Sequence, residues 1–166
     1  MSAIQVRKPD FEAVKRLAWQ VLEVNFVTEP PVIAARLART YHLEALEADF
    51  KPEYDHIAGF IDFGKMKILA NAKDNIARKN FTTAHELGHY LLNHNIENGY
   101  TVLLRDMGAM IKTPIEQEAN CFAANVLVPK PFLRHYLDNY SPTNKQLAGV
   151  FGVSEDVIRY QKLYLR

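Results

Sequence analysis

The chain has 166 residues, of which 48% are hydrophobic and 23% charged, and its formal net charge is +1. This balance is typical of a folded chain rather than a disordered one, and the near-neutral charge gives no bulk attraction to nucleic acid or membranes. No apolar run approaches the roughly 20 residues that span a bilayer, and the single cysteine, Cys121, excludes an intrachain disulfide. We therefore expect a cytoplasmic protein with no membrane partner.

Two helices are predicted in the first quarter of the chain. The first covers 11–26, begins at the capping residue Asp10 and repeats apolar residues at helical spacing. The second covers 28–41 and starts on the proline pair Pro30–Pro31. We treat 1–42 as an N-terminal helical part.

A small antiparallel sheet of three strands is predicted next. Residues 43–50 form one strand, and 56–71 form a β-hairpin. Apolar residues flank Gly64, and the pair Gly64–Lys65 suits a two-residue turn with glycine first. We expect an edge strand of this hairpin to bind a peptide as an added strand.

The second half is predicted to be mostly helical. A polar connector at 72–80 precedes a helix at 82–94, and the ambiguous segment 99–112 is interpreted as a partly irregular loop. A further helix begins at Thr113–Pro114 and ends at Pro129.

The tail predicts two short helices about a turn at Gly152, the second capped by Ser154. Helices, then a small sheet, then helices again indicate the α+β class. The length favours one domain over 1–166, with a core at 43–129 and a helical tail at 130–166.

The helix at 82–94 contains His85-Glu86-Leu87-Gly88-His89, the H-E-x-x-H pattern of metalloproteases. Residues i and i+4 share a helix face, so His85 and His89 can aim two imidazoles at one Zn²⁺. Glu86 lies about 100° further around the helix, where it can reach the open coordination position. Gly88 leaves room for another element to pack closely.

An ordinary helix explains part of the same pattern. Thr83 and Glu86 fit a capping box, in which the glutamate stabilises the helix start and has no catalytic role. Isolated helical histidines are also common without a metal. The H-E-x-x-H segment alone therefore leaves both readings open.

A catalytic zinc needs a third protein ligand, and the helix at 113–129 offers Glu116 or Glu118. Glu116 lies on the more apolar flank with Asn120, one turn later, so it is favoured, and Asn120 can orient a metal ligand by a hydrogen bond. The competing role of Glu116 is a capping box with Thr113. Among the other histidines, we expect surface positions for His42, His56 and His135, and a rotation of about 140° places His94 away from the metal that His89 faces.

Two segments together resemble the ImmA/IrrE-type zinc metallopeptidases. The first matches an R-x-x-F-T-x-A-H-E-x-G-H pattern and the second an E-x-E-A-x-x-F-A-x-x-L-x-x-P pattern. The matching residues are Arg78, Phe81, Thr82, Ala84, His85, Glu86, Gly88 and His89, then Glu116, Glu118, Ala119, Phe122, Ala123, Leu127 and Pro129. The resemblance covers about 43–165. One departure is that Asn93 precedes His94, which displaces the histidine that often follows the signature.

This resemblance implies a zincin-like fold, zinc ligands His85, His89 and Glu116, and Glu86 as the catalytic acid and base. It implies a regulatory endopeptidase that cleaves an intracellular protein, such as a helix-turn-helix repressor, and so acts in transcription regulation.

Two other functions remain open. The tail has the outline of a helix-turn-helix whose second helix carries Arg159, Lys162 and Arg166. The alternative is that its apolar residues pack on the core, and the small basic footprint argues against direct nucleic-acid binding. The chain could also be a catalytically inactive metal-binding partner.

Overall fold

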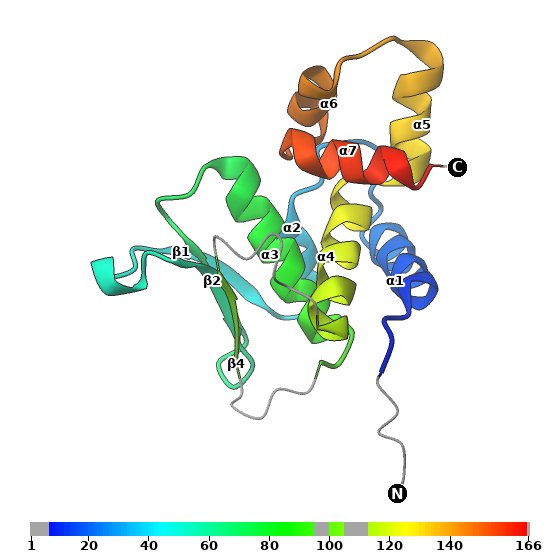
Figure 1. Cartoon of the computed structure of the whole chain (residues 1–166). Coiled ribbons are helices and arrows are strands. Elements are labelled where there is room, and N and C mark those ends of the chain that lie inside the picture. The colour runs from blue at the N-terminus through cyan, green and yellow to red at the C-terminus, as the bar shows by residue number, and fades with distance from the viewer. Residues whose placement is uncertain (1–6, 95–99, 105–112, 166) are drawn as a thin grey trace, which may run out of the picture.

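The computed structural model describes residues 7–94, 100–104 and 113–165. Figure 1 shows one small sheet beside a group of packed helices, so the α+β class is confirmed. The helices are α1 (Phe11–Val24), α2 (Ala34–Thr40), η1 (Pro52–Tyr54), α3 (Ile76–Leu91), α4 (Pro114–Leu127), α5 (Lys130–Asn139), α6 (Asn144–Phe151) and α7 (Glu155–Leu163). The strands are β1 (Glu44–Ala48), β2 (Ile57–Asp62), β3 (Lys67–Asn71) and β4 (Tyr100–Leu104). No helix in the described part is long and apolar enough to cross a membrane.

The sheet is larger than predicted and is mixed. Its order over the described residues is β1-β3-β2-β4, so four strands replace the predicted three. β1 runs parallel to β3, whereas β2 pairs antiparallel with β3 and β4. β1 and β3 share a direction because β2 reverses the chain between them. The fourth strand comes from the segment 99–112, and the remaining residues of that segment, 99 and 105–112, lie outside the described residues.

The turn of the hairpin also differs from the prediction. β2 ends at Asp62 and β3 begins at Lys67, so four residues connect them instead of the pair Gly64–Lys65. The positive φ of 55° falls on Met66, and the Lys65 N–H donates to Asp62 Oδ1 at 3.0 Å. Asp62 therefore stabilises this turn by bonding the backbone locally.

The N-terminal helices follow the prediction only in part. Asp10 caps α1 as expected, because its Oδ1 accepts a hydrogen bond from the Ala13 N–H at 3.0 Å. α2 begins at Ala34, after the proline pair and not on it. Asn80 of α3 fixes this start: its Oδ1 accepts from the Ala34 N–H, and its Nδ2 donates to Val32 O, both at 2.8 Å.

α3 begins six residues earlier than predicted. Asn75 caps it by accepting a hydrogen bond from the Arg78 N–H at 2.8 Å, so half of the predicted polar connector is helical. Thr83 consequently lies inside the helix, where its hydroxyl donates to Lys79 O at 2.9 Å. The capping-box reading of Thr83 and Glu86 is therefore wrong, because neither residue is at the helix start.

α3 lies between the sheet and α4, and α1 covers the other side of α4 (Figure 1). Glycine allows both close approaches of α3. A Cβ on Gly59 of β2 would lie 2.4 Å from Thr82 Cγ2, and one on Gly88 would lie 2.9 Å from Phe122 Cδ1 of α4. The room that the sequence predicts at Gly88 is thus filled by a fully buried ring, which stabilises the fold by roughly 1.5–3 kcal/mol.

The C-terminal helices are α5, which is not among the predicted helices, and then the two predicted short helices. Gly152 joins α6 to α7 with φ 65°, which matches the predicted turn. Ser154 precedes α7 but makes no side-chain cap hydrogen bond. Gln161 of α7 is buried and donates to the carbonyl oxygens of Ala124 and Val128, which docks α7 on the end of α4. Arg166 lies outside the described residues.

Candidate metal centre

The two signature histidines converge on the buried face of α3. His85 and His89 are both inaccessible to solvent, and their Nε2 atoms lie 3.0 Å apart. At that distance the two nitrogens are close enough to face the same partner or the same metal ion. The helix thus brings the two imidazoles to one point, as the i, i+4 spacing predicts.

Glu116 completes a group of three from the first turn of α4. Its Oε2 lies 3.1 Å from His85 Nε2, and its Oε1 lies 3.2 Å from His89 Nε2. Burial alone would raise the pKa of Glu116, but hydrogen bonds and charge from the two rings hold it well below its usual value. The carboxylate therefore faces the histidines in its ionised form. Thr113 makes no capping hydrogen bond, so the competing capping-box role is not observed.

Asn120 lies behind His85, one turn after Glu116. Its Oδ1 is 2.9 Å from His85 Nδ1. An amide oxygen only accepts hydrogen bonds, so the Nδ1 of His85 carries a proton, and Nε2 is the nitrogen that faces Glu116 and is placed to bind a metal. The structure thus brings Asn120 to the position predicted for a residue that orients a histidine.

His94 and Glu118 lie behind His89, and neither was expected there. His94 Nδ1 is 2.8 Å from His89 Nδ1, and His94 Nε2 is 2.9 Å from Glu118 Oε2. Asn93 explains the placement: its φ of 51° ends α3, and the chain turns back so that the His94 N–H donates to His89 O at 3.1 Å. Burial lowers the pKa of His94, although the hydrogen bond with Glu118 opposes that effect.

The remaining predicted residues are placed as follows. Glu86 is fully buried on α3, directly after His85. The structure does not bring His42, His56 or His135 into the cluster; each lies on the surface, as expected.

The three converging groups fit a zinc ion. Ligand atoms around tetrahedral zinc at roughly 2.0–2.1 Å are separated by about 3.3 Å. Here the two Nε2 atoms lie 3.0 Å apart, and each has a different Glu116 oxygen at 3.1 or 3.2 Å. Two imidazoles and a carboxylate are also the donor set that zinc accepts in hydrolytic sites, with the fourth position left open. Among the described residues, His85, His89 and Glu116 form the one group with ligand atoms close enough to share a metal.

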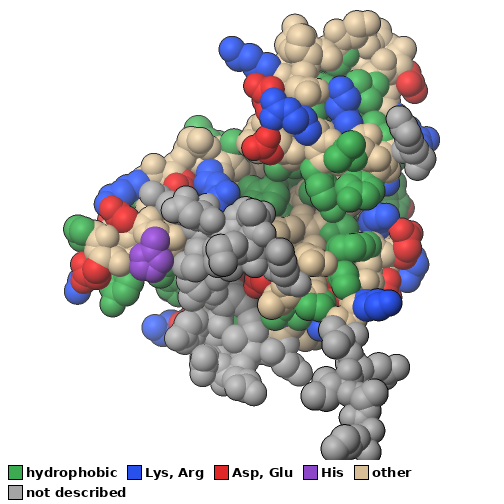
Figure 2. Space-filling view, in the orientation of Figure 1, with side chains coloured by type: hydrophobic (Ala, Val, Ile, Leu, Met, Phe, Trp, Pro, Cys, Tyr) green, Lys and Arg blue, Asp and Glu red, His purple; other side chains and the backbone are tan. Residues whose placement is uncertain are grey.

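A groove of about 1000 Å³ lies between the start of α3 and the start of α7. Figure 2 shows hydrophobic side chains in the hollow below the C-terminal helices. Phe81 lines this groove and stands one turn before His85, with ring centroids 6.5 Å apart.

An H-E-x-x-H helix packed on a small mixed sheet, with a carboxylate supplied by a later helix, defines the zincin class of metallopeptidase fold. The family model of the IrrE N-terminal-like domain, peptidase M78, matches residues 38–161. The chain belongs to this metallopeptidase family.

Two curated relatives agree with this assignment. The radiation response metalloprotease IrrE of Deinococcus radiodurans is 29% identical over 151 residues, which covers 76% of this chain and 44% of that protein. The metallopeptidase ImmA of Bacillus subtilis is 29% identical over 96 residues, covering 56% of this chain and 54% of that protein. The chain thus spans about half the length of these relatives.

A solved structure shares the fold. A Mycobacterium tuberculosis transcriptional regulator superposes with a TM-score of 0.65 at 15% sequence identity, over 90% of this chain and 55% of that chain. This likeness supports the zincin-like fold.

Proposed function

We propose that this chain is a zinc-dependent endopeptidase that hydrolyses a peptide bond in a specific intracellular protein. The observation that carries the proposal is the convergence of Glu116 with the Nε2 atoms of the two buried histidines, His85 and His89. We assign these three residues as zinc ligands and Glu86 as the catalytic residue. Membership in a metallopeptidase family supports a protein substrate.

Bound zinc supplies two things: it lowers the pKa of its water to about 7, and it polarises the scissile carbonyl. The protein residues do the rest. Glu86 accepts a proton from the attacking water and delivers it to the leaving amine. Asn120 accepts a hydrogen bond from His85 Nδ1 and so holds the ring with its Nε2 towards the metal position. Burial of both histidines keeps bulk water away from their nitrogens.

A helix-turn-helix repressor is the substrate we propose, since the resemblance to ImmA/IrrE-type proteins implies that class. The expectation that the hairpin offers an edge strand to the substrate is wrong. β2 and β3 are each paired on both sides, so the free edges of the described sheet belong to β1 and β4. Any added substrate strand would have to pair with one of those two.

The test compares wild type with Glu86→Gln, and with Glu29→Gln as a control that makes the same change on the surface. Each protein is loaded with zinc, checked by elemental analysis, and incubated with repressors encoded nearby. We expect Glu86→Gln to retain zinc and to lose cleavage by about 10²–10⁴-fold, because the proton acceptor is gone. Mass spectrometry of the products measures the rate.

A metal-replete Glu86→Gln protein as active as wild type would exclude this mechanism. Zinc binding with no Glu86-dependent cleavage of any partner would favour the inactive metal-binding partner instead.

DNA binding by the tail is not proposed. Leu147, Phe151 and Ile158 are fully buried, so the apolar face of α6 and α7 packs into the protein. Arg159 forms ion pairs with Glu155 and Asp156 of its own helix. Those carboxylates would repel DNA phosphates at the position where a recognition helix needs positive charge.

A further inference from the structure

We propose that Glu118 and His94 are positioning residues that fix the metal-facing nitrogen of His89. Through these two residues, the segment Arg7–Asp10 helps to hold His89 in its orientation at the proposed metal centre. This inference rests on the proposed zinc site and deepens it, because it names what determines how tightly that site binds its metal.

The contacts form a continuous buried chain. Glu118 Oε2 lies 2.9 Å from His94 Nε2, and His94 Nδ1 lies 2.8 Å from His89 Nδ1. His94 and Glu118 are each 3% exposed, and His89 is fully buried. No solvent-exposed group therefore intervenes between the carboxylate and the proposed ligand.

This series of hydrogen bonds determines which ring nitrogens carry hydrogens. An ionised carboxylate only accepts, so His94 Nε2 carries the hydrogen that faces Glu118. A neutral His94 then has a bare Nδ1, which accepts a hydrogen bond from the Nδ1–H of His89. His89 in that tautomer has a bare Nε2, the form that binds a metal. In the other neutral tautomer of His94, Nε2 carries no hydrogen, and its lone pair would face a lone pair of the Glu118 carboxylate.

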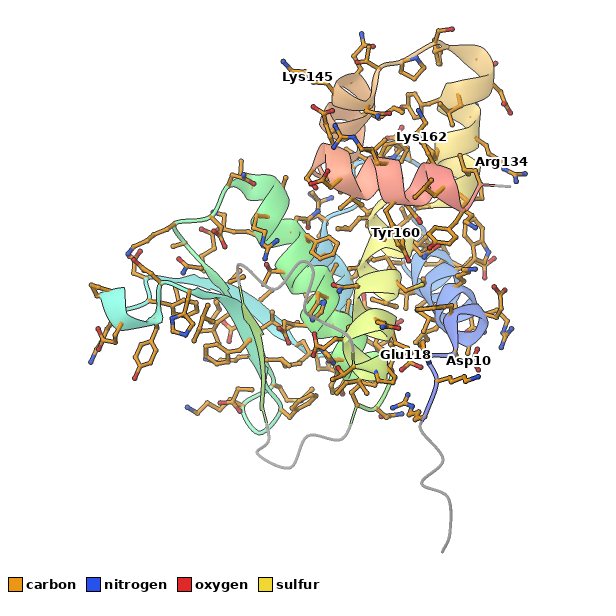
Figure 3. All side chains as sticks on the ribbon, viewed as in Figure 1. Asp10, Glu118, Arg134, Lys145, Tyr160 and Lys162 are labelled. Carbon is orange, nitrogen blue, oxygen red and sulfur yellow. The ribbon has the colours of Figure 1, made fainter. Side chains whose placement is uncertain are left out.

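Glu118 is itself fixed by the N-terminal segment. The Asp10 N–H donates to Glu118 Oε1 at 2.9 Å, and Arg7 Nη2 donates to Oε2 at 2.7 Å. Figure 3 shows Asp10 and Glu118 side by side where the start of α1 meets α4. Both carboxylate oxygens are therefore engaged, and the orientation towards His94 is set by residues that precede the family-matched region 38–161.

A purely structural role is the competing explanation, since the same contacts tie α1 to α4. The two explanations differ in what they change. A structural tie affects only the free energy of unfolding. A positioning role also affects the zinc affinity and the tautomer of His89.

The experiment measures the zinc dissociation constant by chelator competition for wild type, Glu118→Gln and the surface control Glu29→Gln. A glutamine at 118 can both donate and accept, so it no longer imposes one tautomer on His94. We expect zinc binding to weaken about 10–100-fold in Glu118→Gln and to be unchanged in the control. Two-bond ¹H–¹⁵N NMR spectra of the imidazoles should show a mixed His94 tautomer in the same variant.

A second pair of variants covers the case in which Glu118→Gln does not fold. Arg7→Ala and Lys8→Ala remove the same charge from adjacent positions, but only Arg7 contacts Glu118. Arg7 is 58% exposed, so we expect its loss to weaken zinc binding only about two- to fivefold, with Lys8→Ala equal to wild type.

The outcomes separate this inference from the proposed function. Wild type that binds no zinc overturns both. Wild type that binds zinc, together with a Glu118→Gln protein of lower stability but unchanged zinc affinity and tautomers, overturns the positioning role alone. Equal zinc affinity in Arg7→Ala and Lys8→Ala overturns the contribution of the N-terminal segment.

Discussion

Two glutamates on α4, only two residues apart, have different partners. Glu116 faces His85 and His89, whereas Glu118 faces His94 and the N-terminal segment. Residues at i and i+2 lie about 200° apart around a helix, so one element presents carboxylates to both sides of the histidine cluster. Both carboxylates are paired, as the burial of Glu118 and the partial burial of Glu116 require.

Cys121 lies on the same helix, and we expect its thiol to be unreactive in the folded protein. It is 2% exposed, and burial raises the pKa of its thiol from 9.0 to about 11. Only the thiolate reacts readily with disulfide reagents, so we expect no reaction in the native protein near neutral pH and full reaction after unfolding. Absorbance after addition of an aromatic disulfide measures this, and immediate reaction of the folded protein would contradict it.

The same shift gives a pH dependence. Because the pKa is raised on folding, Cys121 contributes stability that is present below pH 9 and is lost as the pH rises towards about 11. The difference in unfolding free energy between wild type and Cys121→Ala should therefore shrink over that interval. Denaturant titrations at several pH values measure it, and a constant difference would contradict the assignment.

At the residue scale, the sequence predicts the residues that converge on the site but not the position of His94 behind them. The i, i+4 rule and the apolar flank lead to His85, His89, Glu116 and Asn120, and the structure brings these four together. The predicted helix over 82–94 continues through His94 and turns its side chain away from His89, whereas α3 ends at Leu91. The left-handed Asn93 was a local signal, since asparagine tolerates positive φ better than most residues, but helical periodicity cannot detect it.

At the scale of elements, the contact between α3 and α4 sets the position of Glu116 relative to the histidines. Gly88 makes this contact possible: an added Cβ would lie 2.9 Å from Phe122 Cδ1 and 3.2 Å from Phe122 Cβ. A core packed at this density cannot absorb another methyl group without moving a helix. The separation of the two helices is therefore coupled to the geometry of the proposed metal centre.

Gly88→Ala tests this coupling, and Gly149→Ala in α6 is its matched control because nothing lies within 4 Å of its added Cβ. We expect Gly88→Ala to reduce the unfolding free energy by about 1–2 kcal/mol and to weaken zinc binding. Gly149→Ala should raise the unfolding free energy by about 0.5–1 kcal/mol, because glycine is unfavourable inside a helix. Thermal unfolding and chelator competition measure both, and equal effects of the two substitutions would contradict the close-contact account.

The elements that the sequence predicts well are those with strong local signals. Asp10 and Gly152 mark boundaries by their own chemistry and are found as predicted. The start of α3 is predicted too late because its first turn contains polar residues that resemble a connector, although Asn75 caps the helix ahead of them. The parallel pairing of β1 with β3 depends on contacts between distant segments, which no local pattern encodes.

At the scale of the whole molecule, the site joins three distant parts of the chain. α3 supplies His85 and His89, α4 supplies both carboxylates, and the segment before α1 holds Glu118. The family match begins at residue 38, so this last contact is contributed by a part of the chain outside the matched region. Packing of α1 against α4 therefore links the N-terminal helices to the proposed metal centre.

The zinc content of the purified protein tests the central claim most directly. Elemental analysis after dialysis would compare wild type with Glu116→Ala, and with Glu29→Ala as a control for loss of a surface carboxylate. We predict about one zinc per chain in wild type and in the control, and none in Glu116→Ala, because two imidazoles alone do not complete the site. A wild-type protein that holds no zinc, or a Glu116→Ala protein that holds as much as wild type, would contradict the account.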